Sequence, residues 1–269
     1  MAKLALTHVS IFVKDLKAAR AFYTRKIGLK VRESEPKMGY LVLGPTKGGE
    51  DAGLNPWQPT AEWGPDWEKY LKQIGGVTGI GFLTTDLKRT VADLKKKGVK
   101  ATGDRRDPMF GRFTDLNGNV LFLAQPPKVK AHRAGLSALA FVTVASKDSK
   151  KAGEFFRKVL GMRVQRVPGE EGGEYFVSYQ VSAKGTAITP FTPTKEMYDN
   201  PSDYDEDMAH IGEETGIGFT TKDIYGLQEQ LMAKGVRFRK KAEATSWGGI
   251  AAEFFDLDDN VYTVMQEER

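Results

Sequence analysis

The stretch LTHVSIFVKDLKAARAFYTRKIGLKV, residues 6–31, predicts a strand, a helix and the start of a second strand. The segment from His8 to Val13 alternates between two faces, as a strand with one buried side does. The first face carries Val9, Ile11 and Val13, and the second carries His8, Ser10 and Phe12. Asp15 stands at an N-cap position, and the apolar residues from Leu16 onward recur at helical spacing. Gly28 suits the left-handed end of that helix, because glycine has no Cβ.

The order of motifs in the first half recurs in the second half. FYTRKIGLKV, from Phe22, corresponds to FFRKVLGMRV, from Phe155, at an offset of 133 residues. Three more pairs follow in the same order: GIGFLTTDL and GIGFTTKDI, LKKKGV and LMAKGV, and DLNGN and DLDDN. This colinear order indicates a duplication with small loop insertions. Each copy contains two βαβββ-like halves, and the second half begins at Gly79 or Gly216, so we expect four such units.

The best candidate for a linker is the polar, basic segment from Pro126 to Arg133, which contains two prolines. The sequence therefore predicts a first module over residues 1–127, a linker over 128–134 and a second module over 135–269.

Composition narrows the class of protein. The chain has 269 residues, 40% hydrophobic and 28% charged, as in a soluble globular protein. It has no cysteine, which excludes disulfides and thiolate metal ligands. No apolar run of about 18 residues is present, and the N-terminus leads directly into a predicted strand, so we expect a cytoplasmic protein without a membrane partner. The net charge of +5 is spread over clusters with acidic neighbours, which predicts no nucleic-acid partner.

Three motifs together resemble the vicinal oxygen chelate superfamily, which includes glyoxalase I, extradiol dioxygenases and bleomycin-resistance proteins. They are THVSIFVKDLKAARAFYTRKIGL, GIGFLTTDL with the helix to LKKKGV, and DLNGNVLFLAQ, and the second copy carries the same marks. The resemblance implies an α+β fold of two tandem glyoxalase-like modules. Its four βαβββ units are expected to form open, U-shaped sheets around cavities.

The resemblance also implies where a metal would bind. Metal-using members supply a His from the first strand, a His or Glu from the middle strand and a Glu from the strand after the D-G-N turn. In this chain His8 matches the first position of the first module. The remaining positions hold no ligand: they are Gly79, Phe122, Gly216 and Thr263, and no histidine lies on the strand from Leu139 to Val144. A catalytic metal needs about three such ligands, so we predict no metal cofactor, with a divalent metal at a non-standard site around His8 as the alternative.

Aromatic residues predict the character of the ligand. The candidate ligand-binding residues are His8, Tyr40, Trp57, Phe110 and Phe122 in the first module, and Tyr175, Tyr179, Trp247 and Thr263 in the second. Aromatic walls with few polar groups suit a flat or apolar small molecule. The alternative is that the tryptophans only cap an open sheet, an interpretation favoured for Trp63 and Trp67. Glycines at 79, 81, 216 and 218 fit close backbone packing or a bulge, and also a widened cavity, two interpretations that are compatible.

The sequence thus predicts metal-independent binding of a small, mostly apolar or aromatic molecule, for sequestration or in an accessory role. The alternative is an enzyme, a glyoxalase-like lyase or a dioxygenase with a rearranged metal site around His8. A third reading is that one module has lost its pocket. No Gly-x-Ser-x-Gly or P-loop pattern is present, and no catalytic residue is assigned. Two modules suffice for a family-type assembly, so we expect a monomer or a homodimer.

Overall fold

In the computed structural model, the described residues are 3–65, 67–105, 107–126, 133–165, 177–198 and 200–267. The chain divides into two compact units, one formed by His8–Val142 and the other by Met1–Thr7 with Thr143–Arg269. The division points fall inside two strands, β1 (Ala5–Phe12) and β9 (Leu136–Ala145). Most of the predicted linker lies outside the described residues, so the predicted module limits at 127 and 135 stay a prediction.

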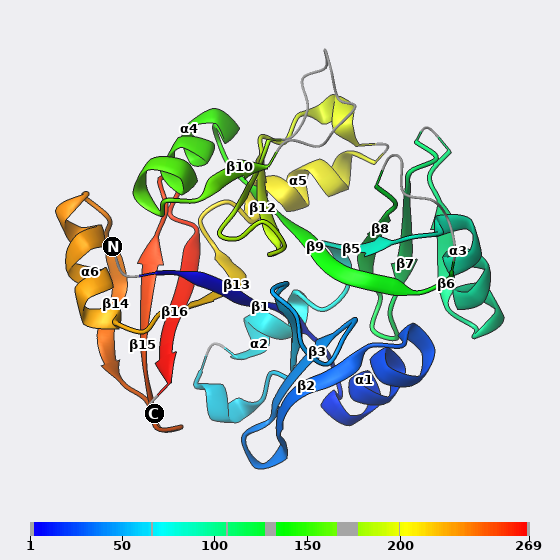
Figure 1. Cartoon of the computed structure of the whole chain (residues 1–269), viewed down its shortest axis with the longest axis horizontal. Helices are drawn as coiled ribbons and strands as arrows, with labels where there is room; N and C mark the ends of the chain where they lie inside the picture. Colours follow the sequence, from blue (N-terminus) through cyan, green and yellow to red (C-terminus); the bar gives the residue numbers. More distant parts are fainter. Residues whose placement is uncertain are drawn as a thin grey trace. The chain divides into compact units, whose positions relative to one another are not determined.

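The unit His8–Val142 contains two βαβββ arrangements (Figure 1). In the first, the strand order is β1-β4-β3-β2, with β1 and β4 parallel and the other neighbours antiparallel. Its elements after β1 are α1 (Leu16–Phe22), the π-helical turn η1 (Tyr23–Ile27), β2 (Lys30–Glu35), the 3₁₀ turn η2 (Pro36–Met38), β3 (Tyr40–Gly44) and β4 (Gly53–Trp57). The 3₁₀ turn η3 (Ala61–Trp63) and α2 (Trp67–Lys72) follow.

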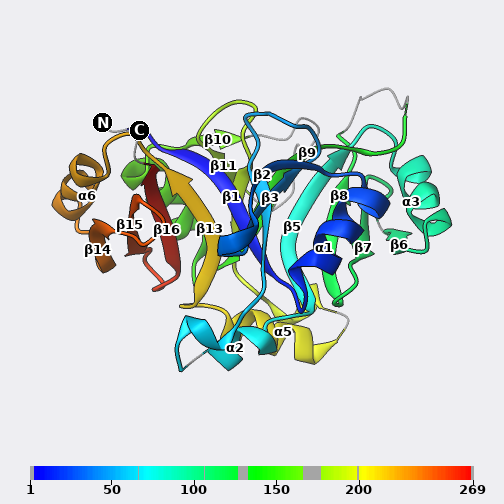
Figure 2. The same ribbon diagram turned by 90° about the horizontal axis from the view of Figure 1, so that it is seen from below.

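The second arrangement repeats this order as β5-β8-β7-β6, with β5 and β8 parallel. Its elements are β5 (Gly76–Thr84), α3 (Leu87–Lys96), β6 (Lys100–Gly103), β7 (Phe110–Thr114) and β8 (Asn119–Ala124). Helix α3 lies along β6 and β7, as Figures 1 and 2 show. The start of β9 pairs antiparallel with the other edge of β5.

The other unit contains the remaining two arrangements. The third has the order β9-β12-β11-β10, and the fourth has the order β13-β16-β15-β14. The elements of the third are α4 (Ser149–Glu154), the π-helical turn η4 (Phe155–Val159), β10 (Arg163–Gln165), β11 (Ser178–Gln180) and β12 (Ala187–Phe191). The 3₁₀ turn η5 (Lys195–Met197) and α5 (Pro201–Ala209) precede β13 (Glu214–Thr220), α6 (Ile224–Ala233), β14 (Phe238–Ala244), β15 (Gly249–Phe255) and β16 (Val261–Glu267).

Local sequence signals determine where the helices begin and end. The Asp15 carboxylate accepts the backbone N–H of Ala18, so the predicted N-cap is confirmed, and Asp86 caps the third helix in the same way by accepting the N–H of Arg89. Gly28 adopts a φ of 91°, which confirms the predicted left-handed end of the first helix. The predicted α+β class and the four βαβββ units are likewise confirmed.

Each sheet buries one face beneath its helices. On β1 the predicted apolar face is confirmed, because Val9, Ile11 and Val13 are all 5% exposed or less. On the fourth arrangement, α6 covers a face that contains the stacked rings of Phe254 and Tyr262, whose centroids lie 5.5 Å apart. Burying these side chains contributes roughly 1.5–3 kcal/mol each. The opposite face of β1 carries His8, Ser10 and Phe12, of which Ser10 and Phe12 are half-buried.

Among the described residues, no helix is both long enough and apolar enough to cross a membrane.

Candidate ligand-binding face

The open face of the first sheet begins with His8, Ser10 and Phe12 on β1. In the parallel register, these residues lie opposite Gly53, Asn55 and Trp57 of β4. Directly opposed residues of neighbouring strands project from the same face. The same face continues onto β3 and β2, where Tyr40 lies opposite Glu35 and Val42 lies opposite Glu33. Strand pairing thus brings side chains from four separate segments onto one surface.

Asn55 orients the tryptophan at the edge of this face. Its side chain is fully buried, and its amide nitrogen donates to the Leu41 carbonyl at 2.7 Å. Its amide oxygen accepts the Nε1–H of Trp57 at 2.5 Å. A buried amide that has both groups hydrogen-bonded resists rotation. The indole of Trp57 is therefore held in one orientation, which leaves its ring for contacts with other rings.

Five rings form a continuous cluster at this face, which we call the aromatic row: Tyr40, Trp57, Trp63, Tyr70 and Phe12. The ring centroids of Tyr40 and Trp57 are 6.0 Å apart, and those of Trp57 and Trp63 are 5.8 Å apart. Trp63 continues to Tyr70 at 5.5 Å, and Phe12 lies 5.3 Å from Tyr70 and 6.1 Å from Trp63. These spacings are those of favourable edge-to-face and tilted pairs. Trp63 remains 40% exposed, so a visiting molecule can reach the row.

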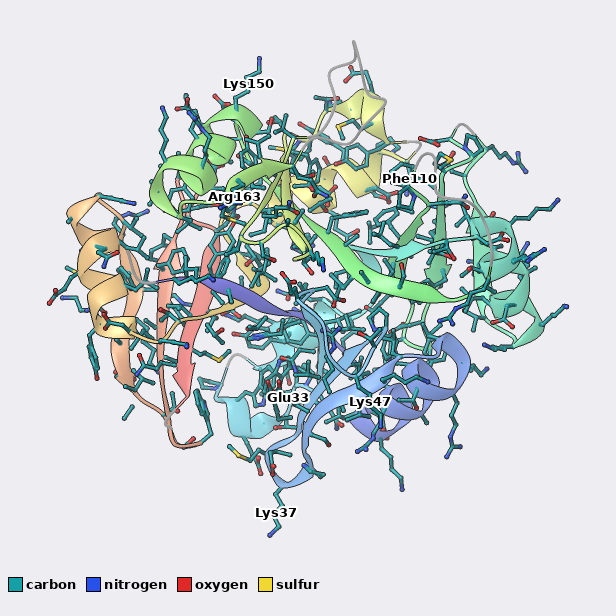
Figure 3. The ribbon with its side chains drawn as sticks, viewed as in Figure 1. Glu33, Lys37, Lys47, Phe110, Lys150 and Arg163 are labelled. Carbon is teal, nitrogen blue, oxygen red and sulfur yellow. The ribbon has the colours of Figure 1, made fainter. Side chains whose placement is uncertain are left out.

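A carboxylate lies at the Tyr40 end of the row. The Tyr40 hydroxyl donates to Oε2 of Glu33 at 3.0 Å. Glu33 is exposed on β2, on the side of the strand away from α1, where Figure 3 labels it. The next residue, Ser34, points the other way and accepts a hydrogen bond from Arg20 of α1 at 3.3 Å. The alternation of β2 therefore explains why Glu33 shares its face with the aromatic row.

His8 lies on this face and is only 9% exposed. Burial lowers the pKa of His8 from 6.5 to about 4, because a charged imidazole loses its hydration there. At neutral pH the ring is therefore uncharged and carries one donor and one acceptor nitrogen.

The donor set around His8 does not suit a catalytic metal ion. Its opposite residue is Gly53, and the nearby amide of Asn55 is already engaged with Leu41 and Trp57. Among the described residues, no group of three or more His, Asp or Glu side chains lies where it could hold a metal. A catalytic zinc site uses about three such ligands and one open position.

Phe110 and Phe122 lie on a different sheet from His8, Tyr40 and Trp57, so the five predicted residues of the first module form two separate groups. Phe122 lies on β8 between two neighbouring strands, and it is paired with Gly81 of β5 and with Arg112 of β7. Phe110 is 38% exposed at the start of β7 and is labelled in Figure 3.

The space above Gly81 is occupied by a ring. A Cβ placed on Gly81 would lie 2.1 Å from Cζ of Phe141. This glycine therefore allows close packing of Phe141, which is the first of the two interpretations given for it. Gly79 is required for another reason, since its φ of 68° lies in the left-handed region that favours glycine. It lies at the point of β5 where the pairing with β8 shifts register.

The predicted residues of the second module are dispersed. Tyr179 lies on β11 beneath α4, with its ring against Gly153 and 5.9 Å from Phe156, so it packs in the core. Trp247, in the turn between β14 and β15, covers Gly249 and is 40% exposed. Thr263 of β16 lies opposite Gly218 and Glu253. Tyr175 lies outside the described residues.

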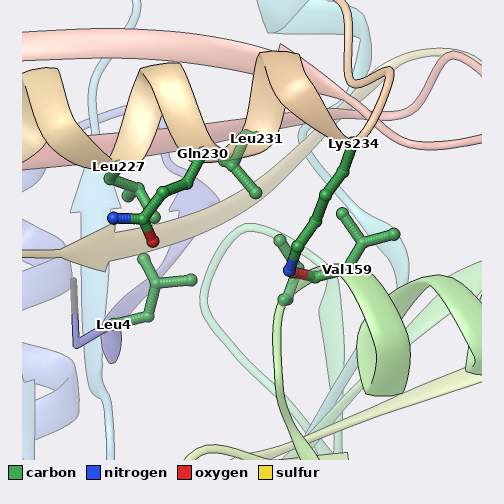
Figure 4. Close-up of a pocket in the computed structure, with 7 residues that line it drawn as sticks. Leu4, Val159, Leu227, Gln230, Leu231 and Lys234 are labelled. Carbon is green, nitrogen blue, oxygen red and sulfur yellow. The ribbon is translucent and has the colours of Figure 1, made fainter. Parts of the chain in front are cut away.

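Two hollows among the described residues are too small or too shallow for the predicted ligand. Figure 4 shows a cavity lined by residues of the turn η4 and helix α6. Its volume is about 20 Å³. There the Lys234 ammonium donates to the Val159 carbonyl at 2.7 Å, which caps the preceding turn. This volume is close to that needed for one water molecule. A depression of about 210 Å³ lies beside α3, lined by Leu87, Lys88, Val91, Gly103 and Pro108.

Two members of the aromatic row, Phe12 and Tyr70, were not predicted from the sequence, and a third was predicted in another role. Phe12 could have been found, because alternation already placed it on the face of His8. Tyr70 lies on α2, and only the tertiary fold brings its ring to Phe12. Trp63 was predicted to cap the sheet, and it contacts Trp57.

Comparison with known proteins agrees with this architecture. The model of the Glyoxalase/Bleomycin resistance protein/Dioxygenase superfamily matches residues 5–123 and 138–263. Glyoxalase I from Zea mays has a similar structure, with 16% sequence identity, coverage of 98% of this chain and 92% of that chain, and a TM-score of 0.64. A candidate dioxygenase from Bacillus subtilis subsp. subtilis str. 168 is 14% identical over 100% of this chain and 87% of that chain, with a TM-score of 0.59. At these identities the likeness shows the fold alone. The chain has no significant match among curated protein sequences.

Proposed function

The chain belongs to the Glyoxalase/Bleomycin resistance protein/Dioxygenase superfamily, in which fold does not determine chemistry, and we propose that it binds a small, flat, mostly apolar or aromatic molecule without a metal. The binding surface is the aromatic row together with His8. A protein of this kind acts by sequestering its ligand or by holding it for another protein.

The observation that carries this proposal is that the polar groups of Trp57 and Tyr40 are already hydrogen-bonded within the protein. The Nε1–H of Trp57 is engaged by Asn55, and the hydroxyl of Tyr40 is engaged by Glu33. Because these two groups are already hydrogen-bonded, a ligand that stacks on the rings of Trp57 and Tyr40 leaves neither group buried without a partner. Stacking and burial on such a surface suit a planar molecule.

His8 supplies a polar group on the same face of the sheet as the rings. Its neutral imidazole can donate a hydrogen bond from one nitrogen and accept one at the other. Because the ring is buried, a hydrogen bond formed there competes little with bulk water. A ligand with one polar group on an otherwise apolar body matches this arrangement.

Equilibrium dialysis with acridine, a flat neutral probe at pH 8, tests the proposal. We expect wild-type protein to bind acridine and Trp57→Leu to bind it roughly tenfold more weakly, which corresponds to the loss of about 1.4 kcal/mol of stacking. Phe12→Leu is the second variant, in case Trp57→Leu does not fold, and circular dichroism checks folding. The matched control is Tyr225→Leu, which removes an aromatic ring that is 52% exposed on α6.

Two results would overturn the proposal. One is the absence of acridine binding to the wild type, and the other is equal binding by wild type and by folded Trp57→Leu and Phe12→Leu. Elemental analysis of the same samples separates the alternative function. About one equivalent of divalent metal, lost in His8→Ala, would instead support a lyase or dioxygenase with a rearranged site.

A further inference from the structure

We infer that the aromatic row selects a planar organic cation, because the row ends at carboxylates that no basic side chain among the described residues neutralises. This inference rests on the proposed function and names the class of ligand. It follows from the positions of Glu33 and Glu35 relative to the rings and from the contacts of the surrounding cations.

Both carboxylates belong to the face of the aromatic row. Glu35 lies opposite Tyr40 and Glu33 lies opposite Val42, so the two side chains are two positions apart on the same side of β2. Glu33 also accepts the hydrogen bond from the Tyr40 hydroxyl at 3.0 Å. The ring of Tyr40 lies 6.0 Å from that of Trp57. A molecule stacked near Trp57 and Tyr40 is thus within reach of a negative charge.

The nearest guanidinium in the sequence is not available to these carboxylates. Arg32 sits at the irregularity between Val31 and Glu33, and its side chain is only 10% exposed. Its Nη2 lies 2.7 Å from Oδ1 of Asp51, its Nη1 donates to the Asp51 carbonyl at 2.7 Å, and its Nε donates to the Thr46 carbonyl at 3.1 Å. The positive charge of Arg32 is therefore neutralised on Asp51.

Lys69 lies at the other end of the row, with its Nζ 4.9 Å from the centroid of the Tyr70 ring, and it forms no ion pair with Glu33 or Glu35. Other cations around this face are engaged or directed elsewhere. Arg20 donates to Ser34 on the opposite side of β2. Figure 3 shows Lys37 pointing outward, away from Glu33. Among the described residues, no ion pair involves Glu33 or Glu35. His8, on the same face, is uncharged at neutral pH.

The aromatic rings and the carboxylates of this face both attract a positively charged ligand. The face of an indole or phenol ring carries negative electrostatic potential and attracts a cation within about 6 Å of its centroid. A neighbouring carboxylate adds Coulomb attraction, which weakens with salt because Glu33 is exposed. An anionic ligand meets repulsion from both sources. A cationic planar body is therefore the class that this surface recognises best.

A matched pair of probes tests the inference: acridine, which is neutral at pH 8, and 10-methylacridinium, a permanent cation of nearly the same shape. In equilibrium dialysis, we expect the wild type to bind the cation about tenfold more tightly than acridine. Glu33→Gln, whose amide oxygen can still accept the Tyr40 hydroxyl, should reduce this ratio to about threefold or less. The control Glu229→Gln removes an exposed carboxylate of α6 and should keep the full ratio.

The outcomes separate the two proposals. If both probes bind equally, and binding still depends on Trp57, the proposed function stands and the selection of cations is wrong. The selection by Glu33 is also wrong if the folded Glu33→Gln variant retains the tenfold ratio. If neither probe binds, or if binding is independent of both Trp57 and Phe12, the proposed function fails and this inference fails with it.

Discussion

The hydroxyl of Tyr23 donates a hydrogen bond to Oδ2 of Asp115 at 2.8 Å, and both side chains are buried. Tyr23 belongs to the turn that follows the first helix, whereas Asp115 belongs to the turn between β7 and β8. Asp115 also accepts the backbone N–H of Asn119 at 2.9 Å, and Asn119 donates to the carbonyl of Phe12 at 3.0 Å. The carboxylate therefore connects the two βαβββ arrangements of its unit.

In the other unit the equivalent carboxylate is that of Asp256, and the tyrosine that donates to it comes from a different position in the repeat. Asp256 accepts the hydroxyl of Tyr262 at 3.1 Å. At the offset of 133 residues between FYTRKIGLKV and FFRKVLGMRV, Tyr23 corresponds to Phe156. At the offset of 141 residues between Asp115 of DLNGN and Asp256 of DLDDN, Tyr262 corresponds to Leu121. Each buried carboxylate thus has one tyrosine, supplied by a helical turn in one unit and by a strand in the other. Burial and the neighbouring carboxylate raise the pKa of both tyrosines well above the usual value, so each hydroxyl remains a donor.

We predict that Tyr23→Phe and Tyr262→Phe each lower the free energy of unfolding by about 1–2 kcal/mol, because each leaves a buried carboxylate with one donor fewer. Urea denaturation followed by circular dichroism measures the change. Tyr225→Phe, which alters an exposed hydroxyl, is the control and should change stability by about 0.5 kcal/mol or less. Losses of that small size in both buried variants would contradict the prediction.

Local signals explain which parts of the fold could be predicted from sequence. Asp15, Asp86 and Gly28 act on backbone groups within a few residues, so their roles follow from the sequence alone. The bond between Tyr23 and Asp115 spans 92 positions. No local pattern distinguishes this tyrosine from the phenylalanine at its repeat position. Such a contact requires the three-dimensional arrangement of the two βαβββ units.

The candidate site, too, could be predicted only where a local sequence pattern places its residues. Alternation placed His8 and Phe12 together, and the aromatic composition pointed to Tyr40 and Trp57. Grouping Phe110 with them assumed that neighbouring segments of the chain line one pocket, whereas the structure assigns it to a different sheet. Aromatic type alone also does not reveal on which side of a strand a ring lies, which is why Tyr179 was predicted at a pocket and lies beneath a helix.

The contact of Phe141 with Gly81 gives a prediction about packing. Gly81→Ala places a methyl group where the Phe141 ring lies, and overpacking of this kind costs about 1–3 kcal/mol. Urea denaturation should show this loss. A second substitution, Phe141→Leu, should recover part of it in the double variant, because the smaller side chain leaves room for the methyl group. The control is Gly48→Ala, where no atom lies within 4 Å of the new Cβ. Equal stability of Gly81→Ala and Gly48→Ala would contradict the prediction.

The ion pair between Arg32 and Asp51 gives a prediction about buried charge. Their side chains are 10% and 7% exposed, and Oδ2 of Asp51 also accepts the backbone N–H of Leu139 at 2.9 Å. Arg32→Met leaves the carboxylate buried without its countercharge, so we expect a loss of about 3 kcal/mol in urea denaturation.

The double variant Arg32→Met/Asp51→Asn should recover at least half of that loss, because the second substitution removes the unpaired charge. Lys97→Met is the matched control, since Lys97 forms an ion pair with Asp93 in which both side chains are about 40% exposed. Such exposed pairs contribute about 1 kcal/mol or less. A double variant less stable than Arg32→Met alone would show that Asp51 stabilises the fold chiefly through its hydrogen bond with the backbone N–H of Leu139.

The pKa of His8 determines a pH dependence of stability. In the folded chain this pKa is about 4, whereas that of an unfolded histidine is 6.5. Between these values the unfolded chain binds a proton that the folded chain does not, so stability falls as the pH is lowered from about 7 to 4. The full difference corresponds to about 3 kcal/mol, of which about 2 kcal/mol is lost by pH 5.

His8→Gln removes this titration, so urea denaturation at pH 7.5 and pH 5 should show a smaller loss in the variant than in the wild type, by about 2 kcal/mol. Nuclear magnetic resonance provides an independent check, because the imidazole signal absent from His8→Gln should titrate near pH 4 in the folded wild type. Titration of that signal near 6.5 would mean that water reaches the imidazole. The binding surface would then lack an uncharged imidazole that is shielded from water. A ligand would gain little from a hydrogen bond to His8.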